Sequence, residues 1–181
     1  MVPKPAAHMT RDDYVCLKTR TVYLDGEVDG NMVWKTIRSL AILEGSDQVQ
    51  MYLDSDGGYV HEAWAIIDAL HRSPIEVDII GTGQVCSAAA DVIIFGPKHH
   101  RWATPNTVFM MHPPSFELPE AESDKQKSRT DWEASATKAY LRRLARVLGK
   151  KVSTVEKLIA NDWYFNAKDA LKHNIIDDVW R

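Results

Sequence analysis

The sequence predicts an α/β fold in which mainly parallel strands alternate with crossover helices. Strand-like segments at 22–24, 48–54 and 77–80 are separated by segments at 29–44 and 58–72, in which apolar residues recur at helical spacing. Parallel strands need crossover connections of this kind, so the alternation favours parallel pairing. With 181 residues, the chain is long enough to bury a core as one domain.

The N-terminal elements follow from spacing and turn residues. Residues 1–19 are expected to form a short flexible segment, and residues 20–181 a single domain. After the first strand, Asp25-Gly26-Glu27 is expected to form a turn. The next helix, at 29–44, is expected to bury the face that carries Val33, Ile37, Leu40 and Leu43.

The C-terminal elements include one long helix. Residues 97–107 contain the basic run Lys98-His-His-Arg101 and are expected to form a solvated surface loop. A helix at 122–148 carries an apolar stripe and is expected to protrude and contact another subunit, although the pattern alone fits a helix laid along the core equally well. A capping box at Ser153–Glu156 should begin the next helix. Asn166 should cap the helix that follows, and Asn174 should adopt a left-handed conformation.

Ser87 is the first candidate for a catalytic residue. It follows an apolar strand and a turn with two glycines, and it precedes a run of small helix-forming residues. A hydroxyl at such a corner lies beside unpaired backbone N–H groups that can stabilise an oxyanion. A serine in this position can equally be an ordinary helix N-cap.

Three other features favour the catalytic interpretation. His112 ends the apolar run at 108–111, where an imidazole could accept a serine proton. Asp162 lies beside a bulky apolar cluster and could orient that imidazole. The glycine pair Gly57-Gly58 ends the strand at 48–54, so a backbone N–H there could approach a substrate closely.

At these residues the sequence resembles the proteolytic subunit of the Clp protease, including its divergent, phage-type relatives. The resemblance runs from about Arg20 to the C-terminus and rests on four motifs in the family's order. These motifs are Ser55-Asp-Gly-Gly58, Gly83-Gln-Val-Cys-Ser87, Pro105-Asn106 with Met110-Met-His112, and Asp162-Trp-Tyr-Phe-Asn-Ala167-Lys-Asp-Ala170. The intervals of 29 residues from Gly58 to Ser87 and 25 from Ser87 to His112 match those of the family.

The resemblance implies an α/β fold of the Clp protease and crotonase type with a protruding handle helix. It implies that Ser87 is the nucleophile, His112 the general base and Asp162 its partner, with the N–H groups of Gly58 and Ala88 as the oxyanion hole. The activity implied is that of a serine endopeptidase that cleaves peptides or unfolded protein inside an oligomeric chamber. The implied assembly is a heptameric ring, with a tetradecamer as the stacked form.

The sequence also departs from the family pattern. Asp56 replaces a proline of the glycine turn, and Asp91 lies where an apolar residue is usual, so Asp91 must be either solvated or paired. Ala160-Asn161 replaces the charged pair that helps to couple stacked rings. Only 19 residues precede Arg20, so docking of an AAA+ unfoldase is not assumed.

Composition limits the possible binding partners and the cellular location of the protein. The net charge of −3 gives no electrostatic reason to expect nucleic acid as a partner. Two cysteines, no signal-peptide pattern and no long apolar run favour a cytoplasmic protein without membrane contact. The sequence predicts no cofactor and no metal site, because the histidines have no partners at ligand spacing.

Two other functional classes remain open at this point. The chain could be a catalytically impaired ring or scaffold subunit of the same family, if Asp56 and Asp91 distort the site. It could also be an acyl-CoA enzyme of the related crotonase fold, although a Ser-His-Asp set argues against carboxylate-based chemistry of that kind.

Overall fold

The computed structural model describes residues 10–43, 47–115 and 123–180, and its elements alternate as predicted. The strands are β1 Thr21–Val28, β2 Val49–Gly58, β3 Val77–Cys86, β4 Arg101–Ala103, β5 Val108–Met111, β6 Trp163–Asn166 and β7 Asp178–Val179. The helices are α1 Arg11–Thr19, α2 Gly30–Ile42, α3 Val60–Arg72, α4 Ala88–Ile94, α5 Ser123–Leu148, α6 Val152–Ile159 and α7 Ala167–Lys172.

The chain divides into two compact units. The first contains Met1–Met110 and Tyr164–Arg181, and the second contains Met111–Trp163. Each unit has its own buried side chains. The expectation of one domain over residues 20–181 stays a prediction.

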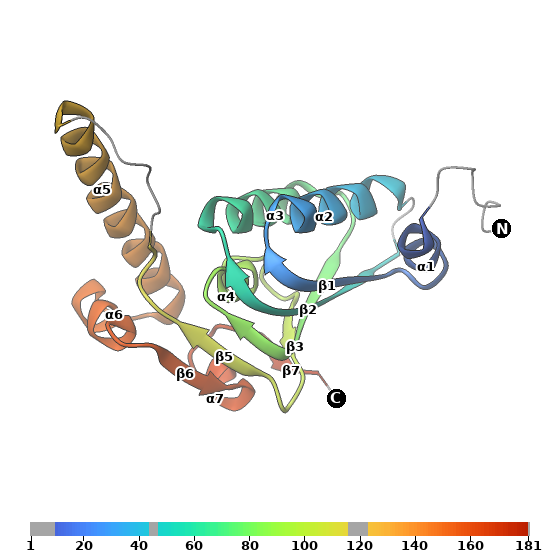
Figure 1. The fold of residues 1–181 in the computed structure, drawn as a ribbon. Coiled ribbons are helices and arrows are strands. Elements are labelled where there is room, and N and C mark those ends of the chain that lie inside the picture. Colours follow the sequence, from blue (N-terminus) through green and yellow to red (C-terminus); the bar gives the residue numbers. More distant parts are fainter. Residues whose placement is uncertain (1–9, 44–46, 116–122, 181) are drawn as a thin grey trace. The chain divides into compact units, whose positions relative to one another are not determined.

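The first unit is built on a mainly parallel sheet. Its strand order is β1-β2-β3-β4-β7, and β5 pairs with both β3 and β6. The pairs β1–β2, β2–β3, β3–β4, β3–β5 and β4–β7 are all parallel, as the alternation of strands and helices predicts. Helices α2 and α3 lie side by side over β1 and β2 (Figure 1). Alternate residues of these strands, such as Leu24, Met51 and Ile79, are fully buried.

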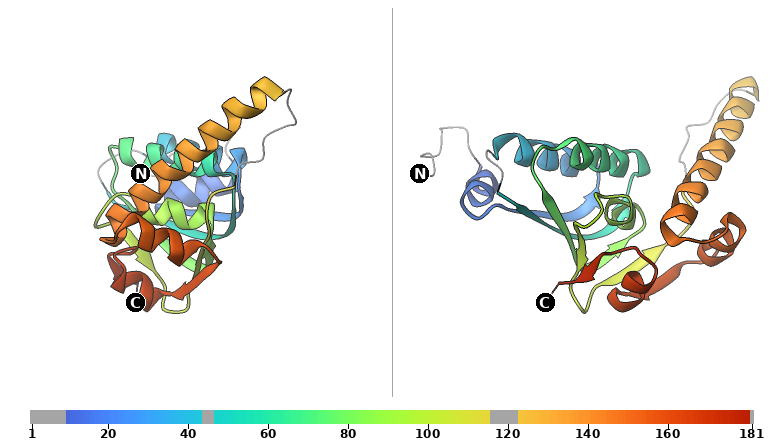
Figure 2. Two further views of the ribbon diagram at one scale, coloured as in Figure 1. Left: turned by 90° about the vertical axis from the view of Figure 1, so that its left-hand side faces the viewer. Right: turned by 180° about the vertical axis from the view of Figure 1, so that it is seen from behind.

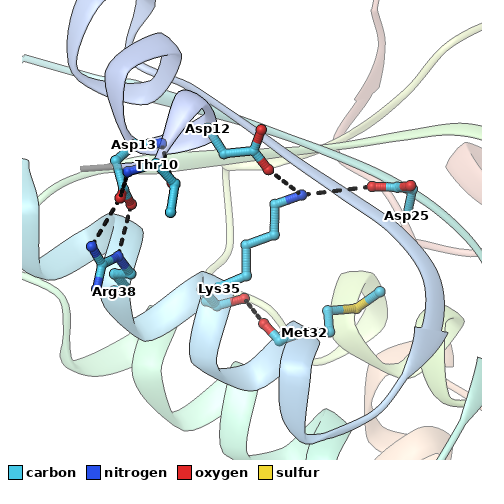
Figure 3. Close-up of polar contacts among 8 residues, drawn as sticks. Thr10, Asp12, Asp13, Asp25, Met32, Lys35 and Arg38 are labelled. Atoms are coloured by element: carbon cyan, nitrogen blue, oxygen red, sulfur yellow. Dashed lines mark hydrogen bonds and ion pairs between the residues drawn. The ribbon is translucent and has the colours of Figure 1, made fainter. Parts of the chain in front are cut away.

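The N-terminal end of the described chain is helical. Thr10 caps α1 through a reciprocal capping box with Asp13. Both Asp13 carboxylate oxygens also accept hydrogen bonds from Arg38 of α2, at 2.8 and 2.9 Å (Figure 3). Residues 11–19 of the segment expected to be flexible therefore form a helix that an ion pair joins to α2. The rest of that expectation, on residues 1–9, lies outside the described residues.

The buried face of α2 was predicted only in part, because Leu43 is buried as expected and Val33 and Leu40 are half-buried. Met32, Thr36 and Ser39 are buried, whereas the Ile37 side chain is 43 % exposed. Helix α2 packs against β1, α3 and α1, and a side-chain hydrogen bond joins Cys16 of α1 to Ser39. Spacing alone could not show this, because α2 carries apolar residues on several sides, and one of them, Trp34, is 72 % exposed.

Two other local expectations are corrected in the first unit. Residues 25–27 form a bulge within β1 rather than a turn, with Gly26 at φ +88°. The solvated loop predicted at the basic run holds for Lys98 and His99, which are exposed, but not for Arg101, which begins β4 and is buried against Asp177. Asn166 caps α7, and Asn174 adopts a left-handed conformation, both as predicted.

The second unit contains the long helix α5 and the short helix α6. The observed bounds of α5, Ser123–Leu148, match the predicted 122–148. Its C-terminal half lies beside α6 (Figure 2), and Tyr140, Leu144 and Val155 are buried. Helix α6 begins at Val152 with Lys151 as its N-cap and without a side-chain cap, so the capping box predicted at Ser153 is wrong.

Among the helices of the described ranges, none combines the length and the apolar character that crossing a membrane requires. The cytoplasmic location stays a prediction.

Candidate active site

The predicted site residues lie on both units. Gly58, Ser87 and Ala88 belong to the first unit, and His112 and Asp162 to the second.

Ser87 lies at the corner where β3 ends at Cys86 and α4 begins at Ala88. Its backbone has φ +52° and ψ −124°, a region that side-chain-bearing residues rarely adopt, at a cost of about 1–3 kcal/mol. Its side chain makes no capping hydrogen bond to α4, so the interpretation as an ordinary helix cap is wrong. A strained serine on a sharp strand-to-helix turn is typical of catalytic nucleophiles.

The structure brings the glycine turn of β2 directly against this corner. Gly57 has φ +108°, and a Cβ placed on it would lie 2.7 Å from the Ser87 Cβ and 3.2 Å from the Ala88 nitrogen. Only glycine permits this approach. The turn is held by Ser55, which is buried and accepts a hydrogen bond from the Gly57 N–H at 3.0 Å. Gly57, the neighbour of Gly58, therefore lies against Ser87 and Ala88 in the first unit. The role of Gly58 and Ala88 as the oxyanion hole stays a prediction.

The Ser87 corner is fixed on its other side by β5. The Ser87 N–H donates to the Met110 carbonyl at 2.8 Å, which continues the β3–β5 ladder past the end of β3. The adjacent Cys86 is not a competing nucleophile, because it is 5 % exposed and burial raises the pKa of its thiol. The negative charge of Asp56 raises the pKa of this thiol further.

Asp91, one of the departures from the family pattern, is buried on α4 and is 4 % exposed. Within the described ranges, every buried side-chain nitrogen or oxygen has a hydrogen-bond partner. Of the two possibilities that the sequence leaves open for Asp91, pairing is therefore correct and solvation is wrong.

In the second unit, His112 follows β5 and is half-buried. Its Nδ1 lies 2.7 Å from the Pro113 carbonyl oxygen. Because a carbonyl can only accept, Nδ1 of the neutral ring carries the proton and Nε2 is left as an acceptor. This tautomer is the one that a general base acting through Nε2 requires.

Asp162 immediately precedes β6 and is exposed. Its carboxylate has no hydrogen-bond or ion-pair partner in the described part of the second unit. The Nδ1 of His112 is instead hydrogen-bonded to the Pro113 carbonyl. The structure therefore does not place Asp162 in contact with His112, and its catalytic role stays a prediction.

Two contributors to the site were missed by the sequence analysis. Ser55 supports the glycine turn, and its place in the motif Ser55-Asp-Gly-Gly58 is a signal that could have identified it. The Pro113 carbonyl accepts a hydrogen bond from His112, and a backbone acceptor of this kind cannot be predicted from the pattern of side chains in the sequence. Across residues 10–43, 47–115 and 123–180, no three His, Cys, Asp or Glu side chains gather as a metal site.

Comparison with known proteins identifies the family. The sequence model of the Clp protease family matches residues 6–181. The chain is 30% identical over 166 residues to the ATP-dependent Clp protease proteolytic subunit 2 of Thermobifida fusca, covering 90% of this chain and 81% of that protein. It is also 30% identical over 174 residues to the proteolytic subunit 2 of Pseudomonas aeruginosa, with 90% and 82% covered.

The fold agrees with a solved structure. A ClpP1 mutant from Listeria monocytogenes superposes with a TM-score of 0.79 at 23% sequence identity, and the match covers 91% of this chain and 92% of that one. The family match over nearly the whole chain, together with the identity to two curated proteolytic subunits, leads to one conclusion: the chain belongs to the Clp protease family and is a serine-type peptidase.

Proposed function

We propose that the chain is an endopeptidase that cleaves peptides or unfolded protein through a triad of Ser87, His112 and Asp162. The observation that carries the proposal is the strained Ser87 backbone at the end of β3, pressed against the Gly57-Gly58 turn. Strain of this kind persists only where the surroundings impose it, and it concentrates at active sites.

In the proposed mechanism, Nε2 of His112 takes the Ser87 hydroxyl proton while Oγ attacks the peptide carbonyl carbon. The oxyanion that forms accepts hydrogen bonds from the N–H groups of Gly58 and Ala88. The imidazolium then gives its proton to the leaving amine, and the C–N bond breaks to leave an acyl-enzyme. Water, deprotonated by His112, hydrolyses the ester and restores Ser87.

The role of Asp162 needs a rearrangement within the second unit. To stabilise the imidazolium, its carboxylate has to replace the Pro113 carbonyl as the acceptor for Nδ1–H. We propose that this change accompanies assembly, because Asp162 is exposed in the single chain and so is open to contacts from a neighbouring copy.

The proposed assembly is a heptameric ring, stacked in pairs to a tetradecamer that encloses the active sites. Membership of the family supports a ring. Trp132 on α5 supports a contact through this helix, because its large aromatic side chain is 55 % exposed in the single chain and a neighbouring copy could bury it. An AAA+ unfoldase is the proposed partner, because the curated relatives are named as subunits of an ATP-dependent protease.

A catalytically impaired ring subunit is the second candidate. The observation that favours it is the exposed Asp162 carboxylate, which has no partner among the described residues of its unit. The two candidates predict different reactivity of Ser87, so one experiment separates them.

The test is the intact mass of the purified protein after treatment with a fluorophosphonate. We expect one adduct on the native chain and none on Ser87→Ala, because only an activated serine displaces fluoride from the reagent. Ser87→Ala should retain the native assembly and lose peptide hydrolysis by several powers of ten. An unmodified native chain, or unchanged hydrolysis by Ser87→Ala, would contradict the proposal and favour the impaired subunit.

A further inference from the structure

The N-terminal helix α1 is attached to the first unit almost without apolar packing. Of its nine residues only Asp13 and Cys16 are buried, so none of its larger apolar side chains enters the core fully. Helix α3, by contrast, buries Ile66, Ile67 and Leu70. A helix of this length is marginal in water by itself. The contacts that keep α1 in place are therefore its polar contacts with β1 and α2.

The strongest of these contacts is the ion pair between Asp13 and Arg38 of α2. Both carboxylate oxygens of Asp13 are used, because Nε of Arg38 donates at 2.8 Å and Nη2 at 2.9 Å (Figure 3). The Asp13 side chain is 6 % exposed and that of Arg38 is 51 % exposed, so the carboxylate is buried while the guanidinium reaches water. The hydrogen bonds from Arg38 hold the pKa of Asp13 well below its usual range, against the opposing effect of burial. A charged, buried carboxylate of this kind depends on its counter-ion.

The other contacts of α1 are weaker. Lys35 of α2 lies 3.3 Å from Asp12 of α1 and 3.7 Å from Asp25 of β1 (Figure 3). Both carboxylates are exposed, so water and salt screen these two pairs. A side-chain hydrogen bond also joins the thiol of Cys16 to Ser39. Without the charge of Arg38, α1 would keep only these screened pairs and a weak thiol hydrogen bond.

The chain that follows α1 is anchored independently of the helix. Arg20 ends α1 in a left-handed conformation at φ +54°. Its carbonyl accepts a hydrogen bond from the Gln50 N–H at 3.0 Å, and its side chain donates to the carbonyls of Asp47 and Gln48. These bonds hold the beginning of β1 beside β2 without any contribution from α1. Residues 19–20 are therefore a hinge about which α1 can move while the sheet stays intact.

We propose that α1 is a hinged cover, held shut by the Asp13–Arg38 ion pair, that opens as one unit while the sheet and α2 stay folded. When shut, it buries Cys16 against Ser39 and forms one wall of a pocket of about 480 Å³ whose other walls are β1 and α2. Opening removes that wall, so the hinged cover controls access to the pocket. The inference concerns conformation and does not depend on the proposed function.

The position of the buried charge explains why α1 opens alone. Asp13 belongs to the hinged cover itself, so the movement of α1 is enough to bring its carboxylate into water. Loss of the Arg38 charge is then relieved by local opening and not by unfolding of the whole unit. Local opening of this kind has a lower free energy than global unfolding, because most of the buried apolar surface stays buried.

The two cysteines report opening and unfolding separately. Cys16 is 2 % exposed on α1, Cys86 is 5 % exposed at the end of β3, and burial raises the pKa of both thiols. Neither thiol should react with a maleimide until the structure around it opens. In the purified native chain, we expect Cys16 to be labelled at least about tenfold faster than Cys86, as peptide mass spectrometry of each cysteine measures.

The urea dependence of Cys16 labelling is the decisive reading on the native chain. Opening a short helix exposes little surface, so the rate should change little with urea below the unfolding transition. A Cys16 rate that rises with urea as steeply as equilibrium unfolding would overturn the inference, whatever the rate at Cys86.

Variants of α2 then test the ion pair. Arg38→Gln should speed Cys16 labelling about thirtyfold or more and leave Cys86 labelling unchanged, because it leaves a buried carboxylate on α1 without its counter-ion. Arg38→Lys should give an intermediate rate, because an ammonium keeps the charge but cannot make the two-pronged contact. Lys35→Gln should speed labelling only about threefold, and less at high salt, because its pairs are exposed.

Arg72→Gln is the matched control, because Arg72 is an exposed arginine in the last turn of α3. It should leave both labelling rates as in the native chain. Hydrogen exchange of Arg38→Gln should show lost protection in α1 and native protection in β2 and β3, which establishes that the variant is folded. Equal acceleration at Cys16 and Cys86 would show that the ion pair stabilises the whole unit, and no acceleration would show that it does not hold α1. Either result would overturn the inference.

Discussion

At Gly57 the backbone approaches the Ser87 corner so closely that a side chain has no room. A Cβ there would lie 2.7 Å from the Ser87 Cβ and 2.8 Å from the Cys86 carbonyl, at a φ of +108°. We therefore predict that Gly57→Ala lowers kcat/KM at least a hundredfold, because displacement of a nucleophile by about 1 Å is enough for such a loss. The same change should destabilise the fold by about 3 kcal/mol through strain and overlap. Peptide hydrolysis and urea unfolding measure the two effects.

Gly149→Ala is the control for backbone strain without collision. Gly149 ends α5 with φ +61°, and a Cβ on it would meet nothing within 4 Å. We expect a cost of about 1 kcal/mol and unchanged hydrolysis. Equal activity of the two alanine variants would show that the contact between Gly57 and Ser87 does not shape the site.

At the scale of single residues, the sequence predicted the corner better than the triad. Gly57 lies against Ser87 and Ala88, and the local motifs indicate such a corner, because each motif is a backbone feature with its own glycine or turn signal. His112 instead bonds a backbone carbonyl, and Asp162 is exposed. Contacts between side chains far apart in sequence depend on the positions of whole elements, which no local pattern specifies.

At the scale of elements, Arg101 and Asp177 join β4 to the segment before β7. The guanidinium donates from Nε at 3.0 Å and from Nη2 at 2.6 Å to the two carboxylate oxygens, and from Nη1 to the carbonyls of Ile94 and Asn174 at 3.2 Å. The Arg101 side chain is 6 % exposed and that of Asp177 is 20 % exposed. We predict that Asp177→Asn destabilises the protein by about 3 kcal/mol, because it leaves a buried guanidinium without a counter-charge. Urea unfolding at pH 7 measures this cost.

The same pair makes stability depend on pH. Burial raises the pKa of Asp177, but the hydrogen bonds and charge of Arg101 outweigh it, so the net pKa lies below its usual value. The stabilisation is therefore complete above the unfolded-state pKa of about 3.9 and is lost as pH falls through the lower, folded-state pKa. The stability difference between the native chain and Asp177→Asn should shrink from pH 7 to pH 3. Asp178→Asn, at the exposed neighbour, should change stability by less than about 0.5 kcal/mol at either pH. A difference that is constant with pH would contradict the assignment.

The order of the helices and strands was predictable from the sequence. Which face of each element is buried, and against which other element, was less predictable. Spacing identified α2 and its buried Leu43 but not the burial of Met32, Thr36 and Ser39, because α2 packs against three elements and one of them, α1, was not predicted as a helix. Likewise, the acceptors of Arg101 lie 7 to 76 residues away in sequence, so a local basic run could only suggest a solvated loop. Periodicity shows that a helix has an apolar side, but tertiary packing decides which side is covered.

At the scale of the whole molecule, the single chain leaves large apolar side chains in water. Trp34 on α2 is 72 % exposed and Trp132 on α5 is 55 % exposed, one in each unit. Tryptophan is among the residues that contribute most to binding at interfaces. The sequence predicted assembly through α5 only by its length and its resemblance to a family, because the apolar stripe alone fits a core helix equally well.

We therefore predict that Trp132→Ala weakens assembly at least tenfold without unfolding the chain. The indole is 55 % exposed in the single chain, and an interface that buried it would lose this burial energy in the variant, so assembly should be weakened more than the fold. Sedimentation velocity over a range of concentrations should show smaller species for Trp132→Ala, with circular dichroism and thermal midpoint close to those of the native chain. Gln126→Ala, at an exposed polar position on the same helix, should assemble normally. Because the engagement of Asp162 is proposed to accompany assembly, Trp132→Ala should also lose fluorophosphonate labelling of Ser87 in parallel with the larger species. Full labelling of a dissociated Trp132→Ala chain would show that each protomer completes its own triad, and that assembly serves only to enclose it.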